Sequence, residues 1–363
     1  MVPEYSNPQG RELSVGVIGA SGWADVAHLP ALTKTPGLRL GAVATSRSES
    51  AKQTAEKWGI DRWYTDAADL ASDPEVDLIT VSVKAPLHRA VIEQIVSAHK
   101  PVLCEWPMGV STAEAIQLAK VFAENHITAF VGLQAAANPV LTQTGRLIAE
   151  GRIGTVLSVT ARASRASKEP VPASSAYTLD VRSGAGTLEI LGGHTLSALF
   201  TALGSMPDSL ASATGTAKLV HRSHVSADGG LIEATSPDVI SGHLNIHPGL
   251  ATVSFTDGDI DPGTEITIVG SAGRVTLRTI AEDELRLRQP QMADWSAQVT
   301  TKAGVETFTA PPTELPLAAR NPSYLYRAIR DDITCGTALV PRADSAVTFH
   351  KILDKFGVTE QVT

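Results

Sequence analysis

The sequence predicts an α/β domain with a doubly wound parallel sheet, followed by an α+β domain with an open, mainly antiparallel sheet. Short aliphatic runs alternate with amphipathic segments from Leu13 to Gln134, and several β-type runs then follow between Leu210 and Leu287. Regular alternation is typical of βαβ units, whereas strands grouped beside separate helices are typical of α+β domains. At 363 residues the chain is long enough for both.

The first domain is expected over residues 1–135. Five mostly aliphatic or β-branched runs suit parallel strands buried on both faces, at residues 15–18, 40–44, 78–83, 102–104 and 129–133. Helices are expected between them, at residues 24–33, 49–58, 88–99 and 113–125. Gly59 suits the left-handed end of the second helix, and Ser111 with Glu114 forms a capping-box pattern before the fourth.

The second domain, over residues 136–340, is expected to serve substrate binding and oligomerisation. Helices are expected at residues 139–150, 188–203 and 323–335, and strands at 153–163, 251–255, 265–269 and 274–277. Residues 164–186 show an irregular polar pattern, and residues 270–273 suit a hairpin turn. Residues 341–363 form a separate helical segment, a candidate for packing on the first domain. Because an open sheet leaves one face to be covered, we expect a homo-oligomer through that face.

The composition argues against several classes of protein. Lys and Arg number 30 and Asp and Glu 38, for a formal charge of −8, and a basic face of the kind that nucleic-acid binders use is not visible. Cys104 and Cys335 are too few for a disulfide framework or a four-cysteine zinc site. The first fourteen residues lack the regions of a secretory signal, and no apolar run reaches the ~18 residues of a membrane span. We expect a cytoplasmic protein without nucleic-acid or membrane partners.

A glycine-containing turn is expected where the first strand meets the first helix, in Val15-Gly-Val-Ile-Gly19-Ala-Ser21-Gly22-Trp23-Ala24. Glycine lets the backbone approach a pyrophosphate, and the helix N-terminus supplies N–H donors. The usual G-x-G-x-x-G is degenerate here, since Ser21 and Ala24 hold its second and third positions. A tight turn also uses glycine for steric reasons alone. We predict a dinucleotide site with Gly19, Ser21, Gly22, Trp23 and Ala24 around the pyrophosphate.

The end of the second strand bears on which dinucleotide binds. NAD-selective proteins often place Asp or Glu here to hold the ribose 2′-hydroxyl. This chain has Thr45-Ser46-Arg47, whose hydroxyls and guanidinium suit a 2′-phosphate. The alternative is that Arg47 is a solvated loop charge. We expect NAD(P) binding with a preference for NADP, and place Ser46 and Arg47 near the adenosine ribose.

Two later segments also follow strand ends, where ligands of doubly wound sheets bind. The first contains Pro86 and His88, and the second is Cys104-Glu105-Trp106-Pro107. We expect both to line the cofactor crevice. Taken alone, His88 suits the start of a helix, and Trp106 suits packing as well as it suits a platform for a cofactor ring.

In combination these motifs resemble the glucose–fructose oxidoreductase, inositol dehydrogenase and MocA family over residues 14–340. The matching elements are the glycine turn, Pro86 with His88, Glu105-x-Pro107, Gln134 and Gly193-His194. Gly22-Trp23-Ala24 with His28-Leu-Pro30, Glu105-Trp106-Pro107, Leu133-Gln134 and Gly193-His194-Thr195 are similar to the branch that contains the fungal galactose-regulon repressor. The resemblance implies a Rossmann domain with Glu105, Trp106 and Gln134 near the nicotinamide.

The chain departs from the family pattern at its acid–base residues. Enzymes of the family carry Glu-Lys-Pro where this chain has Trp106, and two aspartates where it has Ile190 and Ser197. Of the usual acid–base group His194 remains, a residue type suited to proton transfer near neutral pH. Tyr177 is a second candidate proton carrier, and Lys168 a third.

Two functions therefore remain open. We favour an NAD(P)-dependent oxidoreductase acting on a sugar-like or cyclic polyol-like CH–OH or carbonyl group, because most members of the family are dehydrogenases. The alternative is a catalytically reduced NAD(P)-binding sensor or regulator that docks a protein partner, like the galactose-regulon repressor, and Trp106, Ile190 and Ser197 favour it. No metal is predicted, because His221-x-x-His224 and His243…His247 lack an accompanying carboxylate or cysteine set, and residues three apart on a strand point to opposite faces.

Overall fold

The computed structural model describes residues 12–167, 169–205, 213–246, 249–281 and 284–357. The chain divides into two compact units: unit 1 combines Met1–Gln134 with Thr313–Val347, and unit 2 combines Ala135–Pro312 with Thr348–Thr363. The sequence places its boundaries after residues 135 and 340. In the structure the first division falls between Gln134 and Ala135, residues 313–347 belong to unit 1, and residues 348–363 belong to unit 2.

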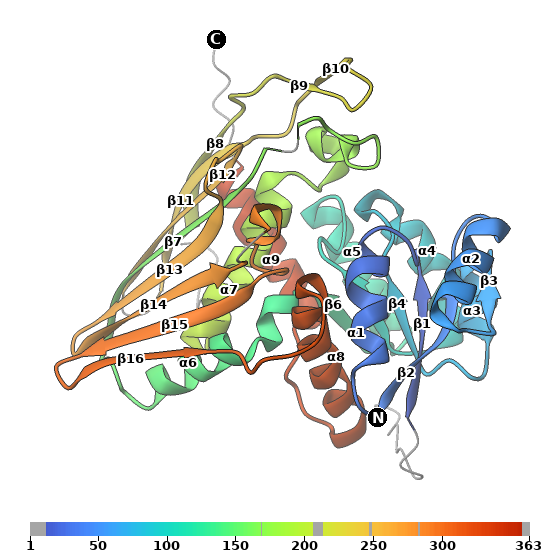
Figure 1. The fold of residues 1–363 in the computed structure, drawn as a ribbon, viewed down its shortest axis with the longest axis horizontal. Helices are drawn as coiled ribbons and strands as arrows, with labels where there is room; N and C mark the ends of the chain where they lie inside the picture. Colours follow the sequence, from blue (N-terminus) through green and yellow to red (C-terminus); the bar gives the residue numbers. More distant parts are fainter. Residues whose placement is uncertain (1–11, 168, 206–212, 247–248, 282–283, 358–363) are drawn as a thin grey trace. The chain divides into compact units, whose positions relative to one another are not determined.

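Unit 1 contains a six-stranded sheet of order β3-β2-β1-β4-β5-β6, in which every pair is parallel (Figure 1). Its strands are β1 (Leu13–Ile18), β2 (Leu38–Ala44), β3 (Trp63–Tyr64), β4 (Leu78–Val81), β5 (Val102–Glu105) and β6 (Ala129–Gly132). The predicted doubly wound sheet is confirmed. The strand order reverses between β1 and β4, and ligands of such sheets bind beyond the carboxyl ends of the strands at that switch point.

The four helices predicted between the strands of unit 1 are present with shifts at their ends, whereas a helix at Ala67–Ser72 was not predicted. The helical elements of unit 1 are η1 (Ala24–His28), α1 (Leu29–Thr33), α2 (Ser48–Trp58), α3 (Ala67–Ser72), η2 (Ala85–Leu87), α4 (His88–Ile95), η3 (Val96–Ala98), α5 (Thr112–Glu124) and α8 (Leu317–Cys335). The turn η4 (Gln134–Ala137) begins at the last residue of this part of unit 1 and continues into unit 2. Gly59 ends α2 with φ +66°. Ser111 Oγ accepts from Glu114 N as a capping box requires, but Glu114 Oε2 accepts from Val110 N instead of Ser111 N.

Unit 2 contains an eight-stranded sheet of order β16-β15-β14-β13-β7-β12-β11-β8, in which only β7 and β12 pair in parallel. Its strands are β7 (Val156–Arg165), β8 (Ala213–Lys218), β11 (Val239–Asn245), β12 (Leu250–Asp257), β13 (Gly263–Gly270), β14 (Gly273–Ile280), β15 (Asp294–Thr301) and β16 (Gly304–Thr309). The strands β9 (Ser223–Val225) and β10 (Leu231–Glu233) form a separate ribbon. The predicted open, mainly antiparallel sheet is confirmed.

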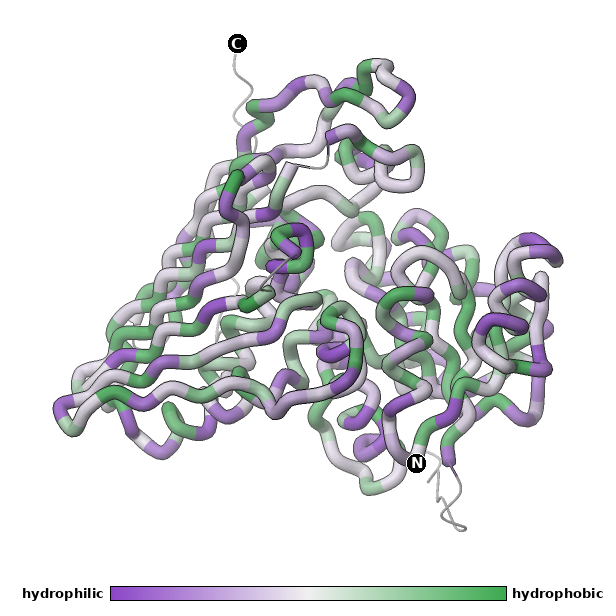
Figure 2. Tube along the Cα trace, viewed as in Figure 1, coloured by the Kyte–Doolittle hydropathy of each residue, from purple (hydrophilic) through white to green (hydrophobic). Residues whose placement is uncertain are grey.

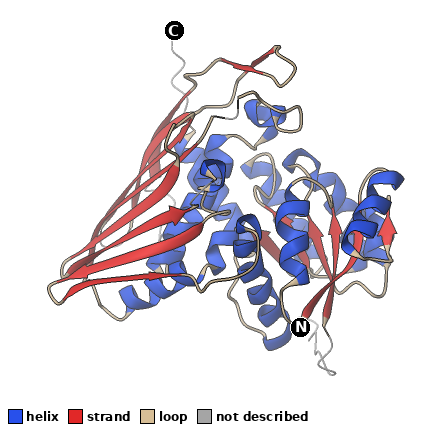
Figure 3. Ribbon diagram, viewed as in Figure 1, coloured by secondary structure: helices blue, strands red, loops and turns tan. Residues whose placement is uncertain are grey.

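One face of this large sheet is buried and the other is exposed. Hydrophobic and hydrophilic residues alternate along its strands (Figure 2). The helices α6 (Pro139–Ala149) and α7 (Gly193–Leu203) pack on the sheet, and α7 continues a widened turn, η7 (Thr187–Gly192) (Figure 3). The strand register aligns a row of polar side chains on the exposed face, in the order Thr214, His243, Thr252, Thr160, Thr267, Thr276 and Gln298.

The remaining helical elements are short turns and the two C-terminal helices. The irregular stretch contains η5 (Ala176–Leu179) and η6 (Val181–Ser183), and η9 (Leu285–Leu287) precedes β15. Helix α8 begins at Leu317 and continues through Pro322, whereas the sequence predicts its start after this proline. Helix α9 (Ala343–Phe356) begins in unit 1 and ends in unit 2.

Candidate functional site

The glycine turn of unit 1 lies at the carboxyl end of β1. Gly19 has φ +83°, and a Cβ at this residue would lie 2.8 Å from both the carbonyl carbon and the oxygen of Ser82. A side chain at residue 19 would therefore clash with Ser82, so glycine is required at this position for steric reasons. Gly22 also has a positive φ, +56°, but a Cβ there would meet nothing within 4 Å. The backbone at Gly22 thus faces open space, as close approach of a pyrophosphate requires.

The side chains after the turn face in different directions. Ser21 is exposed and its carbonyl accepts from Ala24 N at 3.2 Å, whereas Ala24 is fully buried. Trp23 is partly exposed, and its indole N–H donates to Glu105 Oε2 at 3.1 Å. The turn is therefore tied to the end of β5, two strands away in the sheet.

The loop after β2 is the second part of the predicted cofactor site. Ser46 and Arg47 are exposed. Thr45 Oγ1 and Ser50 Oγ each donate to the Arg47 carbonyl, at 2.9 and 3.0 Å, which orders the loop backbone. Within the described part of the chain, the Arg47 guanidinium has no carboxylate within ion-pair distance. It is therefore available to an anionic group.

Glu105, the last residue of β5, is the centre of a buried polar cluster. Its side chain accepts from Gln134 Nε2 at 2.8 and 3.0 Å, in addition to the Trp23 indole. His28 Nε2 lies 3.1 Å from Glu105 Oε1, and the imidazole is fully buried. A Cβ on Gly132 would lie 2.2 Å from Glu105 Oε1, so glycine at the end of β6 makes the room that the carboxylate occupies.

A chain of hydrogen bonds extends from His28 into the interior of unit 1. His28 Nδ1 lies 2.9 Å from the hydroxyl of Tyr326 on α8, and this hydroxyl lies 3.0 Å from Thr80 Oγ1. Burial raises the pKa of Tyr326, so the phenol stays protonated. His28 Nε2 lies at ion-pair distance from Glu105 but has no hydrogen-bond partner among the described residues. His28, Thr80 and Tyr326 were not predicted as site residues, and of the three only His28 belongs to a motif that the sequence offers.

The other predicted residues of unit 1 occupy distinct positions. Pro86 is exposed in η2. His88 is buried at the start of α4, where its ring nitrogens face the carbonyls of Val83 at 2.9 Å and Met108 at 3.3 Å. Burial lowers its pKa and so favours the neutral ring, whose single N–H donates to one of the two carbonyls; the shorter contact is with Val83. Trp106 is buried as well, at 5% exposure.

The two predicted catalytic residues belong to unit 2. His194 is buried in the first turn of α7, and Tyr177 is half-buried in η5, where burial raises the pKa of its hydroxyl. Lys168 lies outside the described residues. Glu189 reaches back to accept from Gly186 N at 3.0 Å and so caps its own turn.

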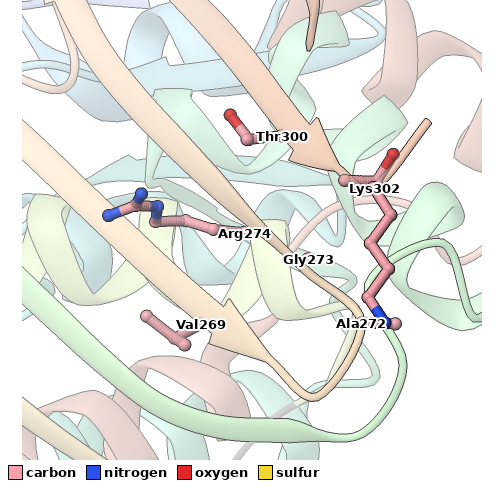
Figure 4. Close-up of a pocket in the computed structure, with 7 residues that line it drawn as sticks. Val269, Ala272, Gly273, Arg274, Thr300 and Lys302 are labelled. Atoms are coloured by element: carbon pink, nitrogen blue, oxygen red, sulfur yellow. The ribbon is translucent and has the colours of Figure 1, made fainter. Parts of the chain in front are cut away.

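Two other places in unit 2 bring histidines or basic side chains together. His221 and His224 have ring centroids 6.3 Å apart, because His221 precedes β9 and escapes strand alternation, and they pair with Asp238 and Glu169 respectively. His247 lies outside the described residues, and among those described, three or more His, Cys, Asp or Glu side chains do not gather as a metal site. A hollow at the tips of the hairpins in unit 2 is lined by Arg274 and Lys302, whose charged ends point to different sides (Figure 4).

Comparison with known proteins agrees with both parts of the fold. Residues 13–133 match the model of an oxidoreductase family with an NAD-binding Rossmann fold, and residues 139–279 match the model of the Gal80p C-terminal domain. The chain joins an oxidoreductase-family Rossmann domain to a Gal80p-like C-terminal domain. The resemblance found in the sequence is thereby confirmed. Among the described residues of both domains, helices with the length and apolar character needed to cross a membrane are absent.

The matches to curated relatives cover only part of the length of each protein. Dehydrogenase aclE of Aspergillus oryzae is 30% identical over 206 residues, which cover 53% of this chain and 56% of that protein. D-apiose dehydrogenase of Paraburkholderia graminis is 26% identical over 140 residues, 39% of this chain and 37% of that protein. The chain thus spans about half or less of these relatives. Sugar dehydrogenases are thus among the curated relatives that the chain matches over part of their length.

Solved structures share the whole fold. A super-repressor mutant of Gal80p from Saccharomyces cerevisiae is 18% identical and superposes with a TM-score of 0.82 over 95% of both chains. Levoglucosan dehydrogenase, in a complex with NADH and levoglucosan, is 16% identical with a TM-score of 0.79 over 95% of this chain and 96% of that one. At these identities the similarity establishes the fold alone, which an enzyme and a regulator both have.

Proposed function

We propose that the protein is an NAD(P)-dependent oxidoreductase acting on a sugar-like or cyclic polyol-like CH–OH or carbonyl group. The observation that carries the proposal is the polar cluster at the ends of β5 and β6, joined through Trp23 to the glycine turn after β1. The two places lie at the carboxyl edge of one sheet, on both sides of the switch point where such sheets bind dinucleotides.

The residues present fit a dinucleotide. Gly22 leaves its backbone open for the pyrophosphate, with Gly19, Ser21, Trp23 and Ala24 forming the rest of the turn. Glu105, Trp106 and Gln134 belong to the half of the sheet that would hold the nicotinamide nucleotide, and Pro86 and His88 shape the loop between the halves.

NADP is the preferred form in this proposal. The loop after β2 offers Ser46 and an Arg47 that pairs with no carboxylate among the described residues, where NAD-selective sites often have a carboxylate. Replacing Arg47 removes a charge-assisted contact worth about 1.5–3 kcal/mol. We expect Arg47→Ala to weaken NADP binding about tenfold or more and NAD binding less than about twofold. Arg274→Ala, a change of an exposed arginine in unit 2, is the matched control.

The bound nicotinamide would supply hydride transfer, and the protein would supply the proton. We propose His194 as the proton carrier and Tyr177 as the second candidate. Because burial raises the pKa of Tyr177, its hydroxyl is protonated near neutral pH and suits a donor better than a base. Trp106 has no ammonium group, so the acid–base role that a lysine plays in related enzymes falls to these residues.

The second candidate function is a nucleotide-responsive regulator with a protein partner. It is favoured by Trp106 in place of the lysine, by the Gal80p-like C-terminal domain, and by the fold shared with Gal80p. In either function we propose a homo-oligomer through the exposed face of the eight-stranded sheet, and a cytoplasmic location. Cys104 and Cys335 are both free thiols, which suits a reducing compartment.

The two functions are separated by nucleotide binding and turnover. Tryptophan fluorescence measures the affinities for NADP and NAD, and nicotinamide absorbance follows turnover with sugars, inositols and keto-sugars. The enzyme predicts turnover that His194→Ala reduces about 10²–10⁴-fold, while His221→Ala, a change of a largely exposed histidine, leaves it unaltered. Nucleotide binding without turnover on any substrate would favour the regulator. Absence of binding by both nucleotides would refute the proposal.

A further inference from the structure

The side-chain oxygen of Gln134 is a buried hydrogen-bond acceptor that receives no hydrogen bond from the described residues. The side chain is fully buried, its Nε2 donates to Glu105, and its Oε1 has no hydrogen-bond partner among the described residues. Building on the proposed nucleotide binding, we propose that Gln134 Oε1 accepts an N–H from the carboxamide of the nicotinamide ring. Gln134 is then the residue that selects a dinucleotide with an intact carboxamide.

The orientation of the Gln134 amide follows from its neighbour. An ionised carboxylate only accepts hydrogen bonds, and Nε2 lies 2.8 and 3.0 Å from its two oxygens. Rotating the amide by half a turn would bring Oε1 to those distances from Glu105 and replace two attractive contacts by two repulsive ones. Glu105 therefore fixes the position of Nε2 and leaves Oε1 as the amide atom without a hydrogen-bond partner among the described residues.

Glu105 is itself held in place from several sides. The Trp23 indole donates to Oε2, His28 Nε2 lies 3.1 Å from Oε1, and Gly132 provides the space in which the carboxylate lies. His28 is held in turn by the Tyr326 hydroxyl. The amide of Gln134 cannot turn unless this cluster is rearranged, so the acceptor is prepared before a ligand binds.

An unsatisfied buried acceptor costs about 1–3 kcal/mol, which a ligand donor recovers on binding. Gln134 lies two residues after Gly132, the last residue of β6, in the half of the sheet that would hold the nicotinamide nucleotide. Phosphate oxygens have no donor at neutral pH. The available donors of that nucleotide are the carboxamide N–H groups and the ribose hydroxyls, and we commit to the carboxamide because its planar amide complements that of Gln134.

The test compares binding of two oxidised dinucleotides. One carries the nicotinamide carboxamide, and the other is its 3-acetylpyridine analogue, in which a methyl group replaces the NH₂. Dissociation constants are measured by calorimetry for the full-length wild type, for Gln134→Met, and for Gln94→Met as a control at an exposed glutamine of unit 1. Methionine has a similar length but no amide oxygen. Binding, and not turnover, is the readout.

We expect the wild type and Gln94→Met to bind the carboxamide form about tenfold more tightly than the analogue, the ratio for about 1.4 kcal/mol. Gln134→Met should bind both forms with equal affinity. A wild type that does not discriminate overturns the inference whatever the variants do, and leaves the proposed function standing. Equal weakening of both forms by Gln134→Met would place the donor on the ribose and also overturn it. If neither form binds the wild type, the proposed function fails with it.

Discussion

Replacing Gly132 by alanine tests whether the Glu105 cluster depends on the absence of a side chain at the end of β6. The new Cβ would lie 2.2 Å from Glu105 Oε1 and 2.7 Å from its Cδ. The φ of Gly132 is outside the left-handed region, so alanine causes no backbone strain there. The expected response is that the Glu105 side chain moves and gives up its contacts with Trp23 and Gln134.

The size of the effect follows from the contacts that are lost. Hydrogen bonds to a charged group contribute about 1.5–3 kcal/mol each, and the displaced carboxylate recovers part of this from other partners. Replacing a glycine by alanine within a strand raises the free energy of unfolding by about 0.5–1 kcal/mol. We therefore expect Gly132→Ala to lower the free energy of unfolding by about 2–3 kcal/mol.

A double-mutant cycle in urea is the appropriate assay. In a Glu105→Ala background the clash with the carboxyl group is absent, although the Cβ still lies 3.0 Å from the Cα of residue 105. The same glycine substitution should then cost less than about 1 kcal/mol, which gives a coupling energy of about 2 kcal/mol. Equal costs in the two backgrounds would refute the argument that Gly132 exists to accommodate Glu105.

Three further changes test other buried groups. Burial lowers the pKa of His350 from 6.5 to about 4, so the unfolded chain binds a proton that the folded chain does not, and stability should fall by about 3 kcal/mol as the pH drops between these values. His350→Leu should flatten this part of the stability–pH profile, and an unchanged profile would contradict the assignment. Asp332→Ala removes the acceptor of two backbone N–H groups and one hydroxyl after α8, and should lower the urea midpoint by the equivalent of about 3 kcal/mol. Arg165→Met leaves Asp257 without its buried partner at 2.8 Å and should cost about 3–5 kcal/mol in thermal unfolding, whereas changing Asp257 to Leu as well should restore much of the loss.

The sequence predicts the central strands of the two sheets better than it predicts the edge strands β3 and β16. Parallel strands buried on both faces give continuous apolar runs, and these locate five of the six strands of unit 1. Strand β3 has two residues, too few for a pattern. In unit 2, β15 was not predicted, although its sequence alternates clearly, with Trp295, Ala297 and Val299 buried. Strand β16 is almost wholly exposed and lacks such a signal.

The candidate site could be predicted where position in the chain implies position in the sheet. Glu105 ends β5 and Gln134 lies two residues beyond the end of the neighbouring strand β6, and their contact follows from that. Tyr326 lies 298 residues from His28, and the proline four residues before it marks a helix start in the sequence but lies inside α8 in the structure. Tertiary packing of α8 outweighs the local preference of proline, and no local pattern indicates which hydroxyl will meet a buried histidine.

The contribution of α8 to unit 1 has a consequence for how the protein is made. Residues 135–312 are inserted within unit 1, whose last strand-contacting segment is synthesised after them. Until Tyr326 and Arg342 leave the ribosome, the buried pair of His28 and Thr80 lacks its shared hydroxyl, and Phe130 lacks the guanidinium 4.7 Å from its ring. The inserted unit thus emerges almost whole while the unit around it is still missing a helix. A gene fragment that ends at residue 134 encodes unit 1 without this helix, whereas one that joins residues 12–134 to 313–347 through a short linker encodes both of its segments.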